Sequence, residues 1–144
     1  MGFTLKVEGP ELIELGLESI RTVQFESDIP IDSNARSKDL GSTVILTGKI
    51  LTAVDGEDAD ATRKIGLWSL VPAERADSYR KATVEVIAAD QVVRKFYYPN
   101  AFVVDYTESY DDTEGVGTFT LVFKQKKDKI STITIEGGYG ATTA

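Results

Sequence analysis

FYYPNAFVVDYTESYDDTEGVGTFTLVF, residues 96–123, contains two apolar, aromatic-rich runs joined by an acidic turn that carries glycine. Both runs are rich in β-branched and aromatic residues, which predicts two strands and a hairpin. A hairpin by itself would expose too many of these side chains to be stable in water. The two strands therefore need a cover, which either the rest of this chain or another copy of it supplies.

The segments outside this hairpin are also predicted to be mainly strands. Apolar and polar residues alternate near residues 3–7 and 19–28, and residues 42–53 are rich in β-branched side chains. Strand signals resume at residues 81–90 and 130–137. Pro99 predicts a break, an edge or a bulge in the strand 92–109. Residues 58–71 predict one helix, because Ile65 and Trp68 recur at helical spacing before Pro72 stops the run.

These segments predict one mainly-β domain over residues 1–144. The expected architecture is an antiparallel β-barrel or a tightly packed sandwich, with one flanking α-helix around residues 58–71. The Gly- and Thr-rich end predicts a flexible C-terminal tail from about residue 137.

The composition argues against several classes of function. The formal net charge is −7, which disfavours a general role in gripping nucleic-acid phosphates or anionic membranes. No apolar run approaches 18 residues, so no membrane span is predicted. The chain has neither Cys nor His, which removes thiolate chemistry and the commonest general base and metal ligand. We therefore expect no catalytic site, no cofactor and no metal.

Two acidic clusters and one basic cluster have simpler explanations than a binding site. Residues 55–60 do not match the glycine position of a calcium loop, and a solvated helix N-terminus explains them better. Residues 111–115 are typical of a hairpin turn. A pair of glycosidase carboxylates remains possible among 23 acidic residues, but no two of them stand apart. The lysines of 124–129 fit a solvated strand end better than an anion site.

The aromatic segment 96–110 leaves an alternative function open. It could form a platform on which a monomeric β-barrel or sandwich binds a carbohydrate or another small molecule. Strict alternation places Phe102, Val104 and Tyr106 on one face of the strand, with Val103 and Asp105 on the other. Apolar residues on both faces instead favour a strand that its own core covers on one side and a neighbour on the other.

The late hairpin resembles that of the inner-tube proteins of contractile injection machines. This family comprises the type VI secretion tube protein and the tail-tube proteins of contractile phages and phage-like particles. The matching motifs are the sequence Asn-Ala-Phe-Val at 100–103 and Phe-Thr-Leu-Val-Phe at 119–123. The sequence SDIPIDSNARSKDLGSTVILTGKI, residues 27–50, is similar to the long loop of the family and the strand that follows it.

The resemblance implies a subunit that forms six-membered rings, and these rings stack into a hollow tube. The strands 96–106 and 42–52 would form joints within a ring, and residues 29–41 and 111–115 would meet the next ring. Within the ring the expected contact residues are Phe96, Tyr98, Phe102, Val104, Tyr106, Val44 and Leu46. Between rings they are Asp32, Ser33, Asn34, Arg36, Lys38, Asp39, Asp111, Asp112 and Glu114.

The resemblance also implies the partners of the chain. They are further copies of the same chain, together with the sheath and the baseplate or spike proteins of the machine. Cargo or DNA would pass through the lumen without tight binding, since a net negative charge repels nucleic acid. Assembly would take place in the cytoplasm without a membrane anchor, and the tube would end in a phage-like particle or outside the cell.

Overall fold

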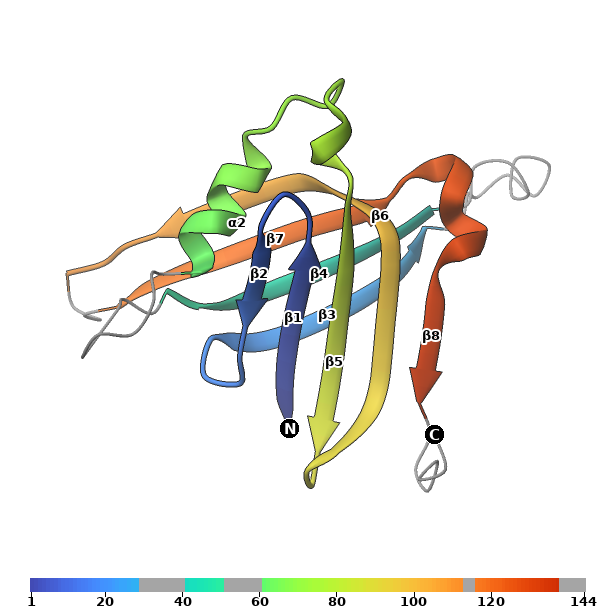
Figure 1. Cartoon of the computed structure of the whole chain (residues 1–144). Coiled ribbons are helices and arrows are strands. Elements are labelled where there is room, and N and C mark those ends of the chain that lie inside the picture. Colours follow the sequence, from blue (N-terminus) through green and yellow to red (C-terminus); the bar gives the residue numbers. More distant parts are fainter. Residues whose placement is uncertain (29–40, 51–60, 113–115, 138–144) are drawn as a thin grey trace.

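The computed structural model describes residues 1–28, 41–50, 61–112 and 116–137, which form two layers of strands and one flanking helix (Figure 1). In this part of the chain, an antiparallel sheet of eight strands follows the order β2-β1-β5-β6-β7-β4-β3, and β8 pairs with β6 beside that path. The strands are β1 (Gly2–Glu8), β2 (Leu12–Leu15), β3 (Ile20–Asp28), β4 (Gly41–Ile50), β5 (Arg80–Ala88), β6 (Gln91–Ser109), β7 (Gly117–Gln125) and β8 (Thr134–Gly137). The helix is α2 (Ala61–Ser69), and two short 3-10 helices are η1 (Ala76–Ser78) and η2 (Lys127–Thr132).

The long strand β6 divides the sheet into two layers. It pairs with β5 as far as Ala101, which lies opposite Arg80, and with β7 from Ala101 onward. The register with β5 shifts between Tyr98 and Ala101, which marks a bulge. Pro99 falls in this bulge, where its missing N–H leaves no donor unpaired. The N–H of Asn100 donates to Oε1 of Gln125 at 2.9 Å, which satisfies the backbone at the bend. Of the break, edge or bulge predicted at Pro99, the structure shows a bulge, because β6 continues through this residue.

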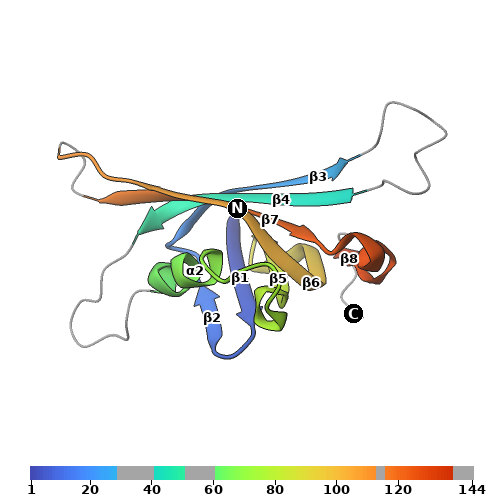
Figure 2. The same ribbon diagram turned by 90° about the horizontal axis from the view of Figure 1, so that it is seen from above.

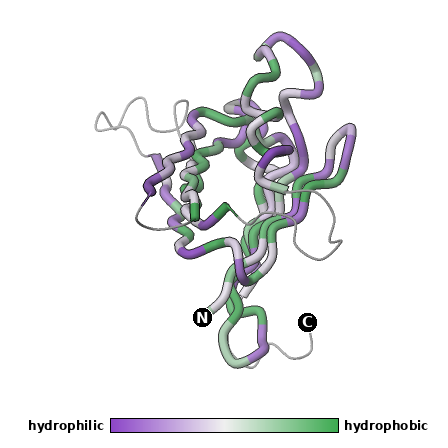
Figure 3. Tube along the Cα trace, turned by 90° about the vertical axis from the view of Figure 1, so that its left-hand side faces the viewer, coloured by the Kyte–Doolittle hydropathy of each residue, from purple (hydrophilic) through white to green (hydrophobic). Residues whose placement is uncertain are grey.

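The two layers face each other, as the view from above shows (Figure 2). We call β2, β1, β5, the first half of β6 and β8 the front sheet. The second half of β6, residues 101–109, forms the back sheet with β7, β4 and β3. Every second residue of β7 is buried, the pattern of a strand with one face on a core. Hydrophobic and hydrophilic residues are interspersed along the chain trace (Figure 3).

The core fills the space between the two sheets. Each large aliphatic or aromatic side chain that is fully buried there contributes about 1.5–3 kcal/mol through removal of apolar surface from water. The largest fully buried side chains are those of Trp68, Tyr98, Phe119, Phe123, Leu5, Ile13, Leu46, Ile65, Leu121, Val7, Val44 and Val84.

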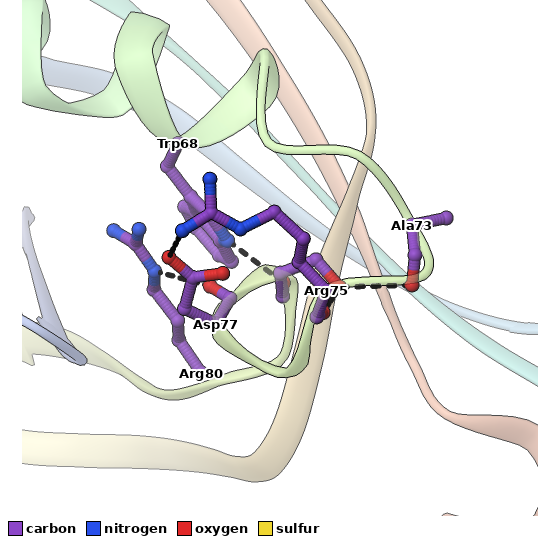
Figure 4. A network of polar contacts seen from close by, with 6 residues as sticks. Trp68, Ala73, Arg75, Asp77 and Arg80 are labelled. Carbon is purple, nitrogen blue, oxygen red and sulfur yellow. Dashed lines mark hydrogen bonds and ion pairs between the residues drawn. The ribbon is translucent and has the colours of Figure 1, made fainter.

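Helix α2 closes one side of the core through Trp68, which is 2 % exposed. Its indole N–H donates to the carbonyl oxygen of Ser78 at 2.9 Å, and the guanidinium of Arg80 lies 5.5 Å from its ring centre (Figure 4). Burial lowers the pKa of Arg80, against the opposing effect of Asp77. Nε of Arg80 donates to the backbone oxygen of Asp77 at 2.9 Å. The helix, η1 and the start of β5 are therefore held together around one tryptophan.

The predicted mainly-β fold with one helix is confirmed. The helix begins at Ala61, and residues 58–60 of its expected range lie outside the described residues. A closed barrel is not formed, because β2 and β3, at the two ends of the strand path, are not paired in the part of the chain described here. The four-residue strand β2 was not predicted. The expected strand 130–137 is shortened to β8 because η2 occupies 127–132.

Candidate assembly site

Four of the predicted contact residues lie in the core of the chain itself. Val44, Leu46 and Tyr98 have no exposed surface, and Phe96 is 8 % exposed. The ring of Phe96 stacks on that of Phe25, with centres 4.8 Å apart. This corrects the prediction for these four side chains, since they have almost no surface to offer to another copy. The back sheet of the same chain, rather than a neighbour, covers Phe96 and Tyr98.

The hydroxyl of Tyr98 is buried between the layers, where it forms a hydrogen bond with the hydroxyl of Ser42. The tyrosine ring also packs edge-on against Phe123, with ring centres 5.5 Å apart. Burial raises the pKa of Tyr98 to about 12, although the hydrogen bond from Ser42 acts in the opposite direction. Tyr98 is therefore a structural residue of the core.

This pKa predicts a loss of stability in alkaline solution. An exposed tyrosine ionises near pH 10, so between about pH 10 and 12 the unfolded chain releases a proton that the folded chain keeps. We expect Tyr98 to contribute its full stabilisation below pH 10, and the free energy of unfolding to fall by about 2–3 kcal/mol from pH 10 to 12. Urea denaturation across this pH range measures the change.

The matched variant is Tyr98→Phe. It should lose about 1 kcal/mol at neutral pH, because the hydroxyl of Ser42 loses its bond to Tyr98 and keeps only that to the backbone oxygen of Glu26. It should also lose this part of the alkaline dependence. An equal alkaline fall in the variant and the natural chain would contradict the assignment to Tyr98.

The other three predicted contact residues do not share one face of β6. A bulge between Val103 and Asp105 makes Val104 an extra residue, and its side chain is 49 % exposed. Tyr106 packs against the core, and its hydroxyl donates to Oε2 of Glu108 at 2.6 Å. Phe102 packs edge-on against Tyr79, with ring centres 5.7 Å apart. The strict alternation assumed from the sequence is thus wrong on this strand, because the bulge shifts it by one residue.

The aromatic segment 96–110 does not form a single exposed platform. Phe96 and Tyr98 belong to the core, whereas Tyr97 is on the opposite side of the strand. A groove of about 720 Å³ lies over the outer surface of the front sheet, and Tyr97 is the aromatic residue in its lining. Six of the thirteen residues in that lining are charged, namely Lys6, Glu8, Glu14, Glu85, Lys95 and Glu136. Nothing here favours the small-molecule alternative.

The residues expected to join successive rings fall partly outside the described residues. These are Asp32, Ser33, Asn34, Arg36, Lys38, Asp39 and Glu114. Asp111 and Asp112 are exposed just beyond the end of β6. The strand registers place this end, where Ser109 faces Thr118, opposite to the end at which Asp28 faces Gly41. The predicted ring-stacking residues of 29–41 and those of 111–115 thus attach to opposite ends of the back sheet.

The back sheet has an outer face that the sequence reasoning missed. Its side chains alternate with those of the core. On β4 and β7 they are Thr43, Ile45, Thr47, Lys49, Thr118, Thr120, Val122 and Lys124. The front sheet and α2 lie on its other face (Figures 1 and 2). In the described part of the chain, β3 pairs only with β4, and residues 102–109 of β6 pair only with β7. Among the described residues, the back sheet therefore has a free edge on each side.

Two further observations concern the chemistry of the described residues. They contain no group of three or more acidic side chains that could hold a metal ion. None of their helices has both the length and the apolar character needed to cross a membrane.

No protein-family model matches the chain, and no curated protein matches it. Solved structures do match it over nearly its whole length. Hcp1 from Flavobacterium johnsoniae is 17 % identical and has a TM-score of 0.58, and the match covers 96 % of this chain and 97 % of that one. The chain has the Hcp1 fold.

Two further structures with the Hcp1 fold come from different sources. Hcp1 from Escherichia coli EAEC 042 is 11 % identical, with a TM-score of 0.53 and coverage of 95 % of this chain and 99 % of that one. A chain of the PVC sheath–tube complex, an extracellular contractile injection system, is 12 % identical with a TM-score of 0.51. Its match covers 95 % of this chain and 89 % of that one. At the level of fold, the resemblance inferred from the sequence is confirmed.

Proposed function

We propose that this chain is the structural subunit of a hollow tube in a contractile injection machine. Copies of the chain form rings, six-membered as the resemblance implies, and the rings stack into the tube. The observation that carries the proposal is a back sheet with two free edges among the described residues. A chain of a sheath–tube complex shares this fold over 95 % of this chain and 89 % of its own. The role is structural, without a catalytic step.

The shape of the chain supports a ring with an open centre. Free edges on opposite sides of one sheet are different surfaces, so copies that meet through them form a heterologous, head-to-tail contact. Such a contact closes into a ring when the rotation between copies is regular. The front sheet and α2 occupy one face of the back sheet, so the bulk of each copy lies outward and the uncovered face lines the hole.

The placement of the strand ends supports stacking. Residues 29–40 connect β3 to β4 at one end of the back sheet, and Asp111 and Asp112 follow β6 at the other. Opposite ends of the strands would then face the two neighbouring rings. Of the predicted contact residues within the ring, the proposal keeps Phe102, Val104 and Tyr106, whose side chains retain exposed surface.

The remaining parts of the proposal concern partners and location. A sheath and a baseplate or spike would surround and anchor the tube, and cargo or DNA would pass through its lumen without tight binding. Assembly would take place in the cytoplasm, without a membrane anchor, before the finished tube leaves the cell.

Electron microscopy and light scattering of the purified chain test this function. We expect rings with a central hole, or stacks of them, and a solution mass that is a whole multiple of the chain mass. A monomer at all accessible concentrations, also in the presence of preformed tube ends as nuclei, would contradict the proposal.

Deletion of residues 33–38 separates stacking from ring formation. If this segment joins successive rings, the deletion should leave single rings of normal mass and reduce the tubes to fewer than about a tenth of the particles, since removal of such contacts costs more than 1.4 kcal/mol per joint. Micrographs of both proteins at equal concentration give the ratio of rings to tubes. Tubes of normal length in the deletion variant would assign stacking to other residues.

A further inference from the structure

A row of four threonines crosses the entire back sheet. Thr107 of β6 lies opposite Thr120 of β7, Thr120 lies opposite Thr47 of β4, and Thr47 lies opposite Thr22 of β3. The hydroxyls of Thr22 and Thr47 are hydrogen-bonded to each other. The row therefore begins at one free edge of the sheet and ends at the other. Both edge residues, Thr22 and Thr107, are exposed.

The number of strands in the back sheet lets this row continue into a second copy. Each of its four strands is antiparallel to its neighbour, so β3 and β6, at the two edges, run in opposite directions. Rotation about a ring axis keeps strand directions, and β3 of one copy thus meets β6 of the next as an antiparallel pair. In such sheets the N–H and C=O of a residue point to the same side. Because the sheet has an even number of strands, the N–H and C=O groups of Thr22 and Thr107 either both point out of the sheet or both point into it. The two residues can therefore form one regular antiparallel pair between copies.

The residues beside the threonines are complementary in one register. With Thr22 opposite Thr107, Gln24 lies opposite Asp105. Arg21, the extra residue where the register of β3 with β4 shifts between Ile20 and Thr22, lies next to Glu108. Unlike charges and an amide facing a carboxylate both stabilise a cross-strand pair. On the core-facing side, Val23 lies opposite Tyr106, which is a favourable aromatic and β-branched pair.

The neighbouring registers are less favourable. A shift of two residues in one direction places Glu26 opposite Asp105, and like charges directly opposite each other destabilise a sheet. A shift of two in the other direction places Asp105 opposite Thr22 and removes the pairing of Arg21 with Glu108. The sequence of the two edges thus selects one register of three.

We propose that β3 of one copy pairs with β6 of the next copy in this register, so that the threonine row runs without interruption from subunit to subunit. The inference rests on the proposed ring assembly and specifies its joint. The occupant of each free edge is a second copy of this chain. Around the ring, the inner wall then carries a continuous belt of hydroxyl groups without charge.

Engineered cysteines test the joint directly, because the natural chain contains no Cys. Opposite residues of antiparallel strands have Cα atoms about 4.5–5.5 Å apart, within the range that a disulfide can bridge. In one copy, Thr22 and Thr107 are separated by three strand spacings, about 14 Å, and cannot be linked. We expect the double variant Thr22→Cys with Thr107→Cys to form, on mild oxidation, a reducible ladder of linked chains on a denaturing gel.

Three controls define the register and the type of contact. Each single variant should remain unlinked, because a head-to-tail joint never brings two copies of the same residue together. The pair Glu26→Cys with Thr107→Cys should also remain unlinked, since the proposed register separates these positions by four residues, about 13 Å. Linking of a single variant, or of the Glu26 pair in preference to the Thr22 pair, would overturn the proposed joint.

Light scattering on the same samples distinguishes the two levels of the argument. Rings of full mass without linking of the Thr22 pair would overturn the joint and leave the tube function standing. Absence of rings in every sample, the natural chain included, would overturn both.

A charge exchange provides a second test that needs no disulfide. Arg21→Glu and Glu108→Arg should each raise the concentration needed for ring formation by about tenfold or more, because like charges then face each other at every joint. Mixed in equal amounts, the two variants should assemble together in alternation, since each then meets an opposite charge on both sides. Failure of the mixture to assemble better than either variant alone would contradict the pairing of Arg21 with Glu108.

Discussion

Replacement of Trp68 by alanine should lower the free energy of unfolding by about 3–5 kcal/mol, the range for removal of a buried tryptophan. The indole is 2 % exposed, packs against Phe123 with ring centres 6.5 Å apart, and donates to the carbonyl oxygen of Ser78. Its loss leaves a cavity below α2, an unpaired carbonyl oxygen and an Arg80 guanidinium without its aromatic partner. Urea denaturation followed by far-ultraviolet circular dichroism measures the change.

Leu67→Ala is the matched control for this variant. Leu67 precedes Trp68 on the same helix, but its side chain is 48 % exposed. Its replacement should change the free energy of unfolding by no more than about 1 kcal/mol, because little apolar surface is lost to water. Both variants need the same low protein concentration, since assembly also stabilises the folded state. Equal losses in the two variants would contradict the central place of Trp68.

Gly48→Ala should be the second most damaging substitution, with an expected loss of about 3 kcal/mol from overpacking and a broken hydrogen bond. A Cβ atom at this position would lie 2.1 Å from the carbonyl oxygen of Ser19 and 2.7 Å from the ring of Phe119. That carbonyl accepts the N–H of Lys49 at 2.7 Å, so the backbone cannot move away without loss of this bond. The thermal midpoint and the urea midpoint should both fall.

Gly66→Ala provides a control of opposite sign. Gly66 lies within α2, and a Cβ atom there would make an ordinary contact of 3.5 Å with the ring of Tyr106. Glycine in a helix interior is less favourable than alanine by about 1 kcal/mol, so this variant should be more stable than the natural chain. Destabilisation by Gly66→Ala, or tolerance of Gly48→Ala, would show that the packing around the two glycines differs from this description.

The fold was accessible from the sequence because local patterns carry most of it. Alternation of apolar residues and enrichment in β-branched and aromatic residues located seven of the strands, and the spacing of Ile65 and Trp68 located the helix. The strand β2 was missed because four residues, Leu12–Leu15, are too short to establish a period. The sequence could not distinguish a closed barrel from a sandwich. Closure depends on whether the first and last strands of the sheet pair with each other, which no local pattern encodes.

The candidate site was less accessible. The aromatic strand correctly drew attention to β6, but Phe96 and Tyr98 turned out to face the core of the same chain. The edge residues Thr22 and Thr107 carry no local signal, since isolated threonines on strands are common. Their significance depends on a register between strands that are far apart along the chain.

By itself, the sequence determined the position of most strands, the single helix, the need for a cover over the hairpin and the absence of thiol and imidazole chemistry. Only the tertiary structure decided which side of each strand this chain covers and where the free edges lie. The physical reason is that alternation defines two faces of a strand without assigning either of them to the core. The bulge at Val104 then changes that assignment in the middle of β6, through pairing with β7.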